Sequence, residues 1–188
     1  MDEYRFYGKY KNVRNAAWNV FLDFGIISLP VRVSQIAKQM GITVLSYSAG
    51  SELIEFWRLG SLCENNDGFA AFIGDQWYIF YNESLQPRAR IRFTLAHELG
   101  HFLLGHELKT TPSDNGSVGF TEENVKKKRK SSLESEADMF AHRLLAPACV
   151  LWGLSISDAE DIASLCGLCL PEAGERARRM KQGKGHGA

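Results

Sequence analysis

Apolar residues recur with a helical period in several separate stretches of this chain. Between residues 14 and 23, Ala17, Val20 and Phe21 fall on one face, which predicts an amphipathic helix that ends before Gly25. The same period, together with helix-starting and helix-breaking residues, predicts further helices over residues 35–40, 51–62, 134–146, 157–166 and 171–180. The chain should therefore be mainly helical.

A smaller part of the chain is rich in β-branched and aromatic residues, which favour strands. Residues 42–47 predict one strand, and residues 68–73 and 76–81 predict two more. Gly74 and Asp75, between the last two, suit the two-residue turn of a hairpin. We expect an α+β fold, with a mainly helical domain and a small antiparallel sheet that precedes the helix described next.

A further helix is predicted between Pro87, near its start, and Gly105, which suits the residue that ends a helix. Apolar residues in this stretch flank the polar residues His97, Glu98 and His101. The number and spacing of the apolar residues predict a buried helix, in which these polar residues form a group. Buried polar groups are costly unless they have partners or bind a metal, so this group needs a chemical reason.

The three polar residues form the pattern H-E-x-x-H. Residues four apart lie on one face of a helix, so the imidazoles of His97 and His101 can bind one Zn²⁺. Glu98, beside the first histidine, can act as the general base toward a metal-bound water. The pattern therefore predicts a zinc-dependent hydrolase with one Zn²⁺ per chain.

A catalytic zinc ion usually has a third protein ligand and one open position. The spacing H-E-x-x-H-x-x-G-x-x-H would supply a third histidine, but this chain has Leu104 and Glu107 at the last two required positions. His106 is one residue away from the place where that histidine would stand. We expect it to lie at the surface or to cap the helix.

A later helix offers two glutamates as the third ligand. Glu134 and Glu136 are two residues apart, so their side chains project about 200° apart and cannot both face the metal. We favour Glu134, because Asp138 lies one turn later on the same face and can accept a hydrogen bond from a ligand histidine. Ala137 keeps that face small, so the two helices can approach closely. Glu136 is the alternative ligand.

Composition narrows the classes of protein that this chain can represent. The 188 residues are 45% hydrophobic and 23% charged, as in ordinary globular proteins. The formal net charge of zero argues against direct nucleic-acid binding over the whole surface. No run of about 18 apolar residues predicts a membrane span, and residues 1–5 do not resemble a secretory signal. We expect a cytoplasmic protein.

We interpret three other stretches as structural features without a direct role in binding or catalysis. The basic run over residues 126–130 is predicted to be a solvated loop, and residues 109–117 are predicted to be a flexible loop. Cys166 and Cys169 form a C-x-x-C pattern that redox or zinc chemistry can use. We interpret them as reduced thiols that pack within a helical segment.

The chain shows no internal repeat and no linker, which predicts one domain over residues 1–180 that contains the proposed zinc site. Within it, residues 14–67 should hold the first helices and a strand, and residues 68–147 the hairpin and the metal-binding helices. Residues 148–180 should form short helices. The Gly- and Lys-rich residues 181–188 are expected to be a disordered tail.

Three motifs in a fixed order make the sequence more specific than H-E-x-x-H alone. They are F-T-L-A-H-E-L-G-H at residues 93–101, E-x-x-A-D-x-F-A at residues 134–141 and L-L-A-P at residues 144–147. Together with the preceding helix, strand and hairpin, they resemble the ImmA/IrrE family of metallopeptidases. The resemblance extends over about residues 14–180.

The resemblance implies a gluzincin-like site in which His97, His101 and Glu134 bind zinc and Glu98 is the catalytic base. Family members are associated with mobile elements, prophages and stress responses, and several cleave, or promote loss of, DNA-bound helix-turn-helix repressors. The resemblance thus implies a zinc endopeptidase whose substrate is a regulatory protein of this kind. The alternative is a zinc-binding regulator that acts through protein contact without proteolysis.

Overall fold

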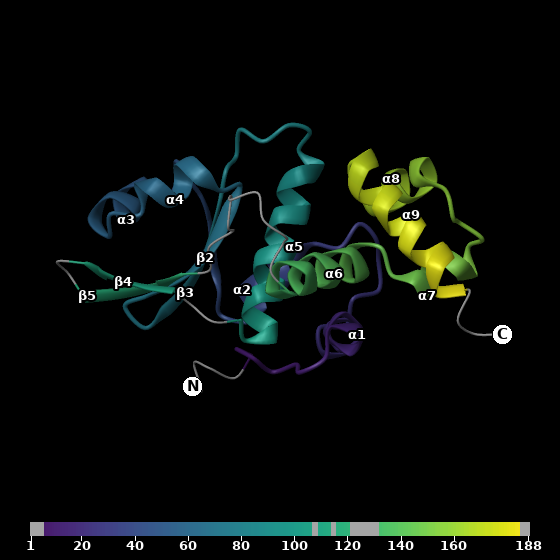
Figure 1. Ribbon diagram of the computed structural model, residues 1–188, viewed down its shortest axis with the longest axis horizontal. Helices are drawn as coiled ribbons and strands as arrows, with labels where there is room; N and C mark the ends of the chain where they lie inside the picture. Colours follow the sequence, from purple (N-terminus) through teal and green to yellow (C-terminus); the bar gives the residue numbers. More distant parts are fainter. Residues whose placement is uncertain (1–5, 107–108, 114–115, 121–131, 185–188) are drawn as a thin grey trace.

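The computed structural model describes residues 6–106, 109–113, 116–120 and 132–184, with the backbone alone over residues 109–113, 116–120 and 183–184. It confirms an α+β fold that is mainly helical (Figure 1). The helices are α1 (Val13–Asp23), α2 (Val33–Gln39), α3 (Ser51–Phe56), α4 (Gly60–Asn65), α5 (Ala89–Leu104), α6 (Ser132–Leu145), α7 (Ala148–Gly153), α8 (Ala159–Cys166) and α9 (Leu170–Lys184). The strands are β1 (Thr43–Ser46), β2 (Gly68–Ile73), β3 (Gln76–Tyr81), β4 (Lys109–Ser113) and β5 (Gly116–Phe120).

Helix α5 lies at the centre of the molecule, between the sheet and helices α7, α8 and α9 (Figure 1). It contacts β2 and β3 on one side and α6, α1 and α2 on others. Helices α3 and α4 lie at the sheet end of the molecule, and α7, α8 and α9 lie at the opposite end (Figure 1). The H-E-x-x-H helix is therefore surrounded by the rest of the fold, which explains why so much of it is apolar.

The sheet is mixed, whereas the sequence predicted an antiparallel one. Its strand order is β1-β3-β2-β5-β4. The predicted hairpin of β2 and β3 is present, but β1 runs parallel to β3, with Thr43 opposite Tyr78. Helices α3 and α4 separate β1 from β2 along the chain and allow this parallel return. Local composition predicts strands but says nothing about which distant strand each one joins.

The prediction of a flexible loop over residues 109–117 is wrong. Strands β4 and β5 form an antiparallel ladder in this region, and β5 joins β2 through Ala71 opposite Phe120. Residues rich in Thr, Ser and Gly pair here because β2 offers them an edge, which composition does not reveal. The basic run over residues 126–130 lies outside the described residues.

Two helix predictions also need correction. The helix expected over residues 51–62 is two short helices, α3 and α4, because Arg58 between them has a left-handed backbone with φ of 56°. Helix α9 extends to Lys184, into the stretch expected to be disordered. Helix α1 has the predicted bounds to within one residue, and the Asn12 side chain accepts a hydrogen bond from the Arg14 amide at its start.

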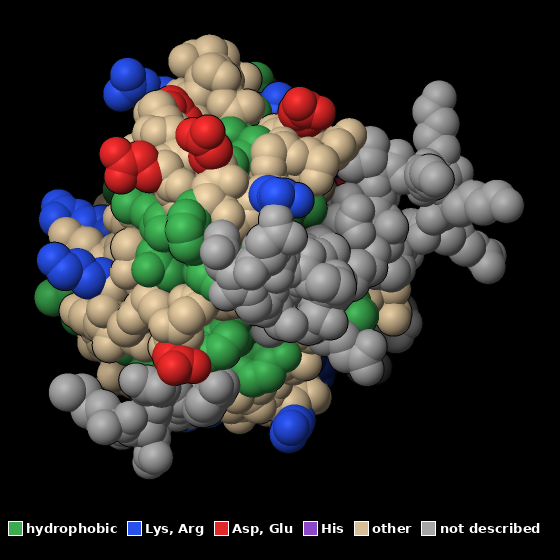
Figure 2. All heavy atoms as spheres, turned by 90° about the vertical axis from the view of Figure 1, so that its left-hand side faces the viewer, with side chains coloured by type: hydrophobic (Ala, Val, Ile, Leu, Met, Phe, Trp, Pro, Cys, Tyr) green, Lys and Arg blue, Asp and Glu red, His purple; other side chains and the backbone are tan. Residues whose placement is uncertain are grey.

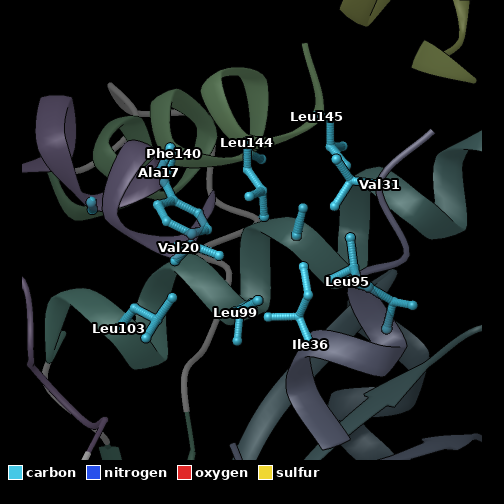
Figure 3. Close-up of a cluster of buried hydrophobic side chains, with 14 of the residues drawn as sticks. Ala17, Val20, Val31, Ile36, Leu95, Leu99, Leu103, Phe140, Leu144 and Leu145 are labelled. Atoms are coloured by element: carbon cyan, nitrogen blue, oxygen red, sulfur yellow. The ribbon is translucent and has the colours of Figure 1, made fainter. Parts of the chain in front are cut away.

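The main core forms where α5 meets α1, α2 and α6 (Figure 3). Leu95, Leu99 and Leu103, spaced at four residues on α5, point into it together with Phe140 and Leu144 of α6. This apolar stripe holds one face of α5 in the core and leaves another face for the polar residues. The core therefore fixes the rotation of α5 about its axis.

A second, smaller core covers the other face of the sheet. Phe69 and Ala71 of β2 pack there with Leu59 and Leu62 from the α3–α4 region, while the intervening Ala70 belongs to the main core. This alternation is that of a strand buried on both faces. Figure 2 shows the surface at the sheet end of the molecule, where hydrophobic patches lie between acidic and basic side chains. Over the described ranges, no helix is long and apolar enough to cross a bilayer.

Candidate metal centre

Helix α5 carries the H-E-x-x-H residues on a buried face. His97, Glu98 and His101 are 5%, 4% and 4% exposed, so all three are shielded from bulk water. The helix begins two residues after Pro87 and ends at Leu104. Gly105 follows in a left-handed conformation with φ of 67°, as the sequence predicted.

The two imidazoles of this helix and one carboxylate of α6 converge. The Nε2 atoms of His97 and His101 are 2.9 Å apart. Glu134 Oε2 lies 3.3 Å from His97 Nε2, and Glu134 Oε1 lies 3.6 Å from His101 Nε2. Among the described residues, these three side chains are the group with ligand atoms within 4.8 Å of one another that could hold a metal ion.

The chemistry of this donor set fits a zinc ion. Two neutral imidazole nitrogens and one carboxylate oxygen are the ligands of a catalytic zinc site that keeps a position open. Burial by itself would raise the pKa of Glu134, but hydrogen bonds and charge interactions with His101 and His97 hold that pKa well below its usual range. The carboxylate is therefore ionised, as a ligand must be.

Close contact between α5 and α6 brings the three side chains together. A Cβ atom at Gly100 would lie 3.3 Å from Ala137 Cα and 3.0 Å from Phe140 Cδ1. Only small residues at positions 100 and 137 allow the two backbones to come this close. The small face that the sequence predicted at Ala137 therefore lies at the crossing of the two helices, next to Glu134.

Asp138 contacts the outer nitrogen of His97. Its Oδ1 atom lies 2.9 Å from His97 Nδ1, and both side chains are buried. A proton on Nδ1 is then donated to Asp138, and the Nε2 lone pair faces Glu134 and His101. The sequence prediction left open whether Asp138 contacts His97 or His101, and in the structure the contact is with His97.

The carboxylate of Glu98 is held by the sheet. Its Oε2 atom accepts a hydrogen bond of 2.9 Å from the backbone N–H of Ala70 in β2. This contact joins residues 28 positions apart, so no local sequence signal predicts it. It ties the orientation of the Glu98 side chain to the hairpin.

The expectation that His106 lies at the surface is wrong, because the side chain is only 4% exposed. Its Nδ1 atom lies 2.9 Å from Nδ1 of His101, and its Nε2 atom lies 3.3 Å from Oε2 of Glu136. Burial and the nearby His101 lower the pKa of His106, and the contact with Glu136 opposes this. The left-handed turn at Gly105 brings the chain back toward the helix, which the periodicity of α5 does not predict.

A cleft of about 410 Å³ lies beside the three converging side chains. His97 and Glu98 line it, and so does His142 of α6, whose ring centroid lies 4.9 Å from that of Phe93. The cleft offers space for a substrate next to Glu98.

The C-x-x-C pair lies apart from this group. Cys166 ends α8 and is fully buried, and Cys169 is 9% exposed. Burial raises the pKa of the Cys166 thiol to about 11, and burial with a contact to Glu172 raises that of Cys169 to about 11. Both are free thiols, as the sequence predicted.

Comparison of the sequence with known proteins finds a peptidase family. The family model of the IrrE N-terminal-like domain, Peptidase_M78, matches residues 37–177. The chain is 38% identical over 71 residues to Metallopeptidase ImmA of Bacillus subtilis (strain 168), which is 38% of this chain and 35% of that protein. The alignment thus spans about a third of the relative. Because the family model covers well over half of the sequence, the chain belongs to the IrrE N-terminal-like domain family of peptidases.

Proposed function

We propose that this chain is a zinc-dependent endopeptidase that hydrolyses a peptide bond in a regulatory protein. The observation that carries the proposal is the convergence of His97, His101 and Glu134 beside a cleft that Glu98 also lines. Membership of a peptidase family and the similarity to a protein named metallopeptidase support it.

His97, His101 and Glu134 would hold the metal in this proposal. Asp138 fixes the proton on Nδ1 of His97, so that Nε2 of that ring keeps its lone pair for the ion. A bound zinc ion would supply Lewis-acid polarisation of the scissile carbonyl and a lowered pKa of water.

Glu98 would act as the general base and then as the general acid. Its carboxylate would take a proton from the attacking water and pass that proton to the leaving amine. The hydrogen bond from the Ala70 amide orients the carboxylate without any contribution from the substrate. A preorganised base of this kind needs no rearrangement when a peptide enters the cleft.

We further propose that the substrate is a DNA-binding repressor of the helix-turn-helix type. The support for this step is the resemblance of the sequence motifs to the ImmA/IrrE family. A protein substrate follows from peptidase chemistry, and the cleft beside the proposed site, which residues of α5, α6 and α9 line, offers space for one segment of such a protein. The proposed reaction would therefore remove a repressor from its operator.

The test is a cleavage assay on purified protein with controlled zinc. Wild type, Glu98→Gln and Glu52→Gln are each mixed with the helix-turn-helix repressor encoded nearest to the gene, and products are read by intact mass. Glu52 is exposed on α3, so its variant is a matched control for the loss of one carboxylate. We expect one discrete cut by wild type and by the control, and a loss of at least about 100-fold in Glu98→Gln.

Equal cleavage by Glu98→Gln and wild type would contradict the assignment of the base. Absence of cleavage in every sample, with zinc bound in each, would contradict the choice of substrate and favour a regulator that acts by contact. A single cut by wild type and Glu52→Gln that Glu98→Gln does not make would identify the bond by the intact mass of its products.

A further inference from the structure

The side of His101 that faces away from Glu134 has a partner of its own. Nδ1 of His101 lies 2.9 Å from Nδ1 of His106. Nε2 of His106, the other nitrogen of that ring, lies 3.3 Å from Oε2 of Glu136. His101, His106 and Glu136 thus form a chain of contacts that runs from the buried centre to a side chain that is 46% exposed.

The two Nδ1 atoms cannot both donate or both accept a hydrogen bond. When Nε2 of His101 binds a metal, the neutral ring carries its proton on Nδ1 and must donate it. His106 then accepts at Nδ1 and carries its own proton on Nε2, where the carboxylate of Glu136 is the acceptor. One set of proton positions satisfies every contact.

Several bonds to the backbone fix His106 in this place. Its N–H donates to the carbonyl of His101 at 3.0 Å, next to the left-handed Gly105. The hydroxyl of Tyr7 donates to the carbonyl of His106 at 2.9 Å, and the N–H of Gly8 donates to the carbonyl of Phe102 at 3.0 Å. The N-terminal segment therefore holds the turn that carries His106. The backbone of His106 is fixed by these bonds, in addition to the contacts that its ring makes.

We propose that His106 is a positioning residue that orients His101 for metal binding, with Glu136 setting the tautomer of His106. The inference rests on the proposed function in one respect, namely that His101 binds a metal through Nε2. The two histidines of the site are then oriented differently. His97 contacts a carboxylate directly, whereas His101 reaches one through a second imidazole.

Zinc affinity, measured by competition with a chromophoric chelator, tests this role without any substrate. We expect His106→Phe to bind zinc about 10- to 100-fold more weakly than wild type. His106→Asn should recover part of this loss, because its amide oxygen occupies nearly the place of Nδ1 and can accept the bond from His101. Glu136→Ala should weaken binding less than His106→Phe does. Glu160→Ala, which removes an exposed carboxylate from α8, should match wild type.

The tautomers of His101 and His106 give a second measurement, which a purely structural role of His106 in packing would not change. Long-range ¹H–¹⁵N spectra of the zinc-loaded wild type should show His106 protonated on Nε2 and His101 protonated on Nδ1. In Glu136→Ala, whose change lies at a partly exposed position, the Nε2 tautomer of His106 should lose population. A proton on Nδ1 of His106 in the loaded wild type would overturn the proposal.

The outcomes separate this inference from the proposed function. Equal zinc affinity in wild type, His106→Phe and Glu136→Ala would overturn the positioning role and leave the metal centre intact. Failure of wild type to bind zinc would overturn both. Circular dichroism of the metal-free variants identifies any that do not fold, and the tautomer measurement on wild type then decides the inference.

Discussion

Glu134 and Glu136 illustrate how two similar side chains on one helix acquire different surroundings. Glu134 is buried and lies against Nε2 of both His97 and His101. Glu136 projects to the other side of α6 and meets His106. The separation of about 200° between residues two apart on a helix predicts this divergence. The sequence pattern could not predict that the second glutamate would also face a histidine.

The cysteines allow a residue-scale prediction from their pKa values. Burial raises the pKa of Cys166 and of Cys169 to about 11, so at pH 8 only about one thiol in a thousand would be ionised. Cys149 is exposed. We expect iodoacetamide at pH 8 to modify Cys149 at least about tenfold faster than the buried pair, as measured by peptide mass spectrometry.

The control for this labelling is the same protein in concentrated urea, where burial is lost and the three thiols should react at similar rates. Modification of Cys166 in folded protein as fast as that of Cys149 would contradict the burial that α8 and α9 provide.

Each residue that sequence reasoning missed makes a contact with a residue far away along the chain. His97, Glu98 and His101 form a recognisable pattern within five consecutive positions. Glu134 was predicted because Asp138 lies one turn later on the same face of its helix. Ala70 donates to Glu98 through the backbone, so its side chain carries no signal. His106 stands outside the helical period because the chain reverses at Gly105. The roles of the predicted residues stay predictions until metal binding and cleavage are measured.

At the scale of elements, the contact between α5 and α6 determines the geometry of the candidate centre. Gly100→Ala would place a methyl group 3.0 Å from Phe140 Cδ1 and 3.3 Å from Ala137 Cα. We expect a net loss of about 1–2 kcal/mol in the free energy of unfolding, because crowding outweighs the gain in helix propensity. Urea unfolding followed by circular dichroism measures it.

Gly174→Ala is the matched control for that substitution. Gly174 lies inside α9, and a Cβ atom there would meet Ala159 Cβ at an ordinary distance of 4.0 Å. This variant should gain about 0.5–1 kcal/mol from helix propensity alone. Equal stabilisation of both variants would show that the α5–α6 contact is looser than these distances indicate.

Element prediction succeeded where the signal was local. The hairpin of β2 and β3 is marked by two β-rich runs and a Gly-Asp turn, and it has the predicted bounds. Partners far along the chain decide the remaining strands: β1 joins β3 in parallel, and β5 adds to β2. Composition cannot predict such pairing, because the same residues without an edge to join would form a loop.

At the scale of the whole molecule, metal binding should stabilise the fold, because the proposed ligands come from two helices. Zinc at a thousand times its dissociation constant should add about 4 kcal/mol to the stability of a site that exists only in the folded state. We expect EDTA to lower the melting temperature of wild type. Glu134→Gln should show a much smaller difference between zinc and EDTA, as measured by differential scanning calorimetry.

A zinc-dependent shift of the same size in Glu134→Gln would contradict its assignment as a ligand. The comparison also controls for zinc bound elsewhere on the surface, since such binding would be common to both proteins.

The brace between Tyr7 and His106 joins positions 99 residues apart, and Glu134 lies 28 residues further along the chain. During synthesis, a nascent chain that has emerged only through α5 holds the two histidines of the proposed site but not its glutamate. Capture of the ion at full affinity must wait until α6 has left the ribosome. Zinc would then enter only after both helices of the proposed site have formed, and hydrolytic activity would appear only after the folding of the peptidase itself.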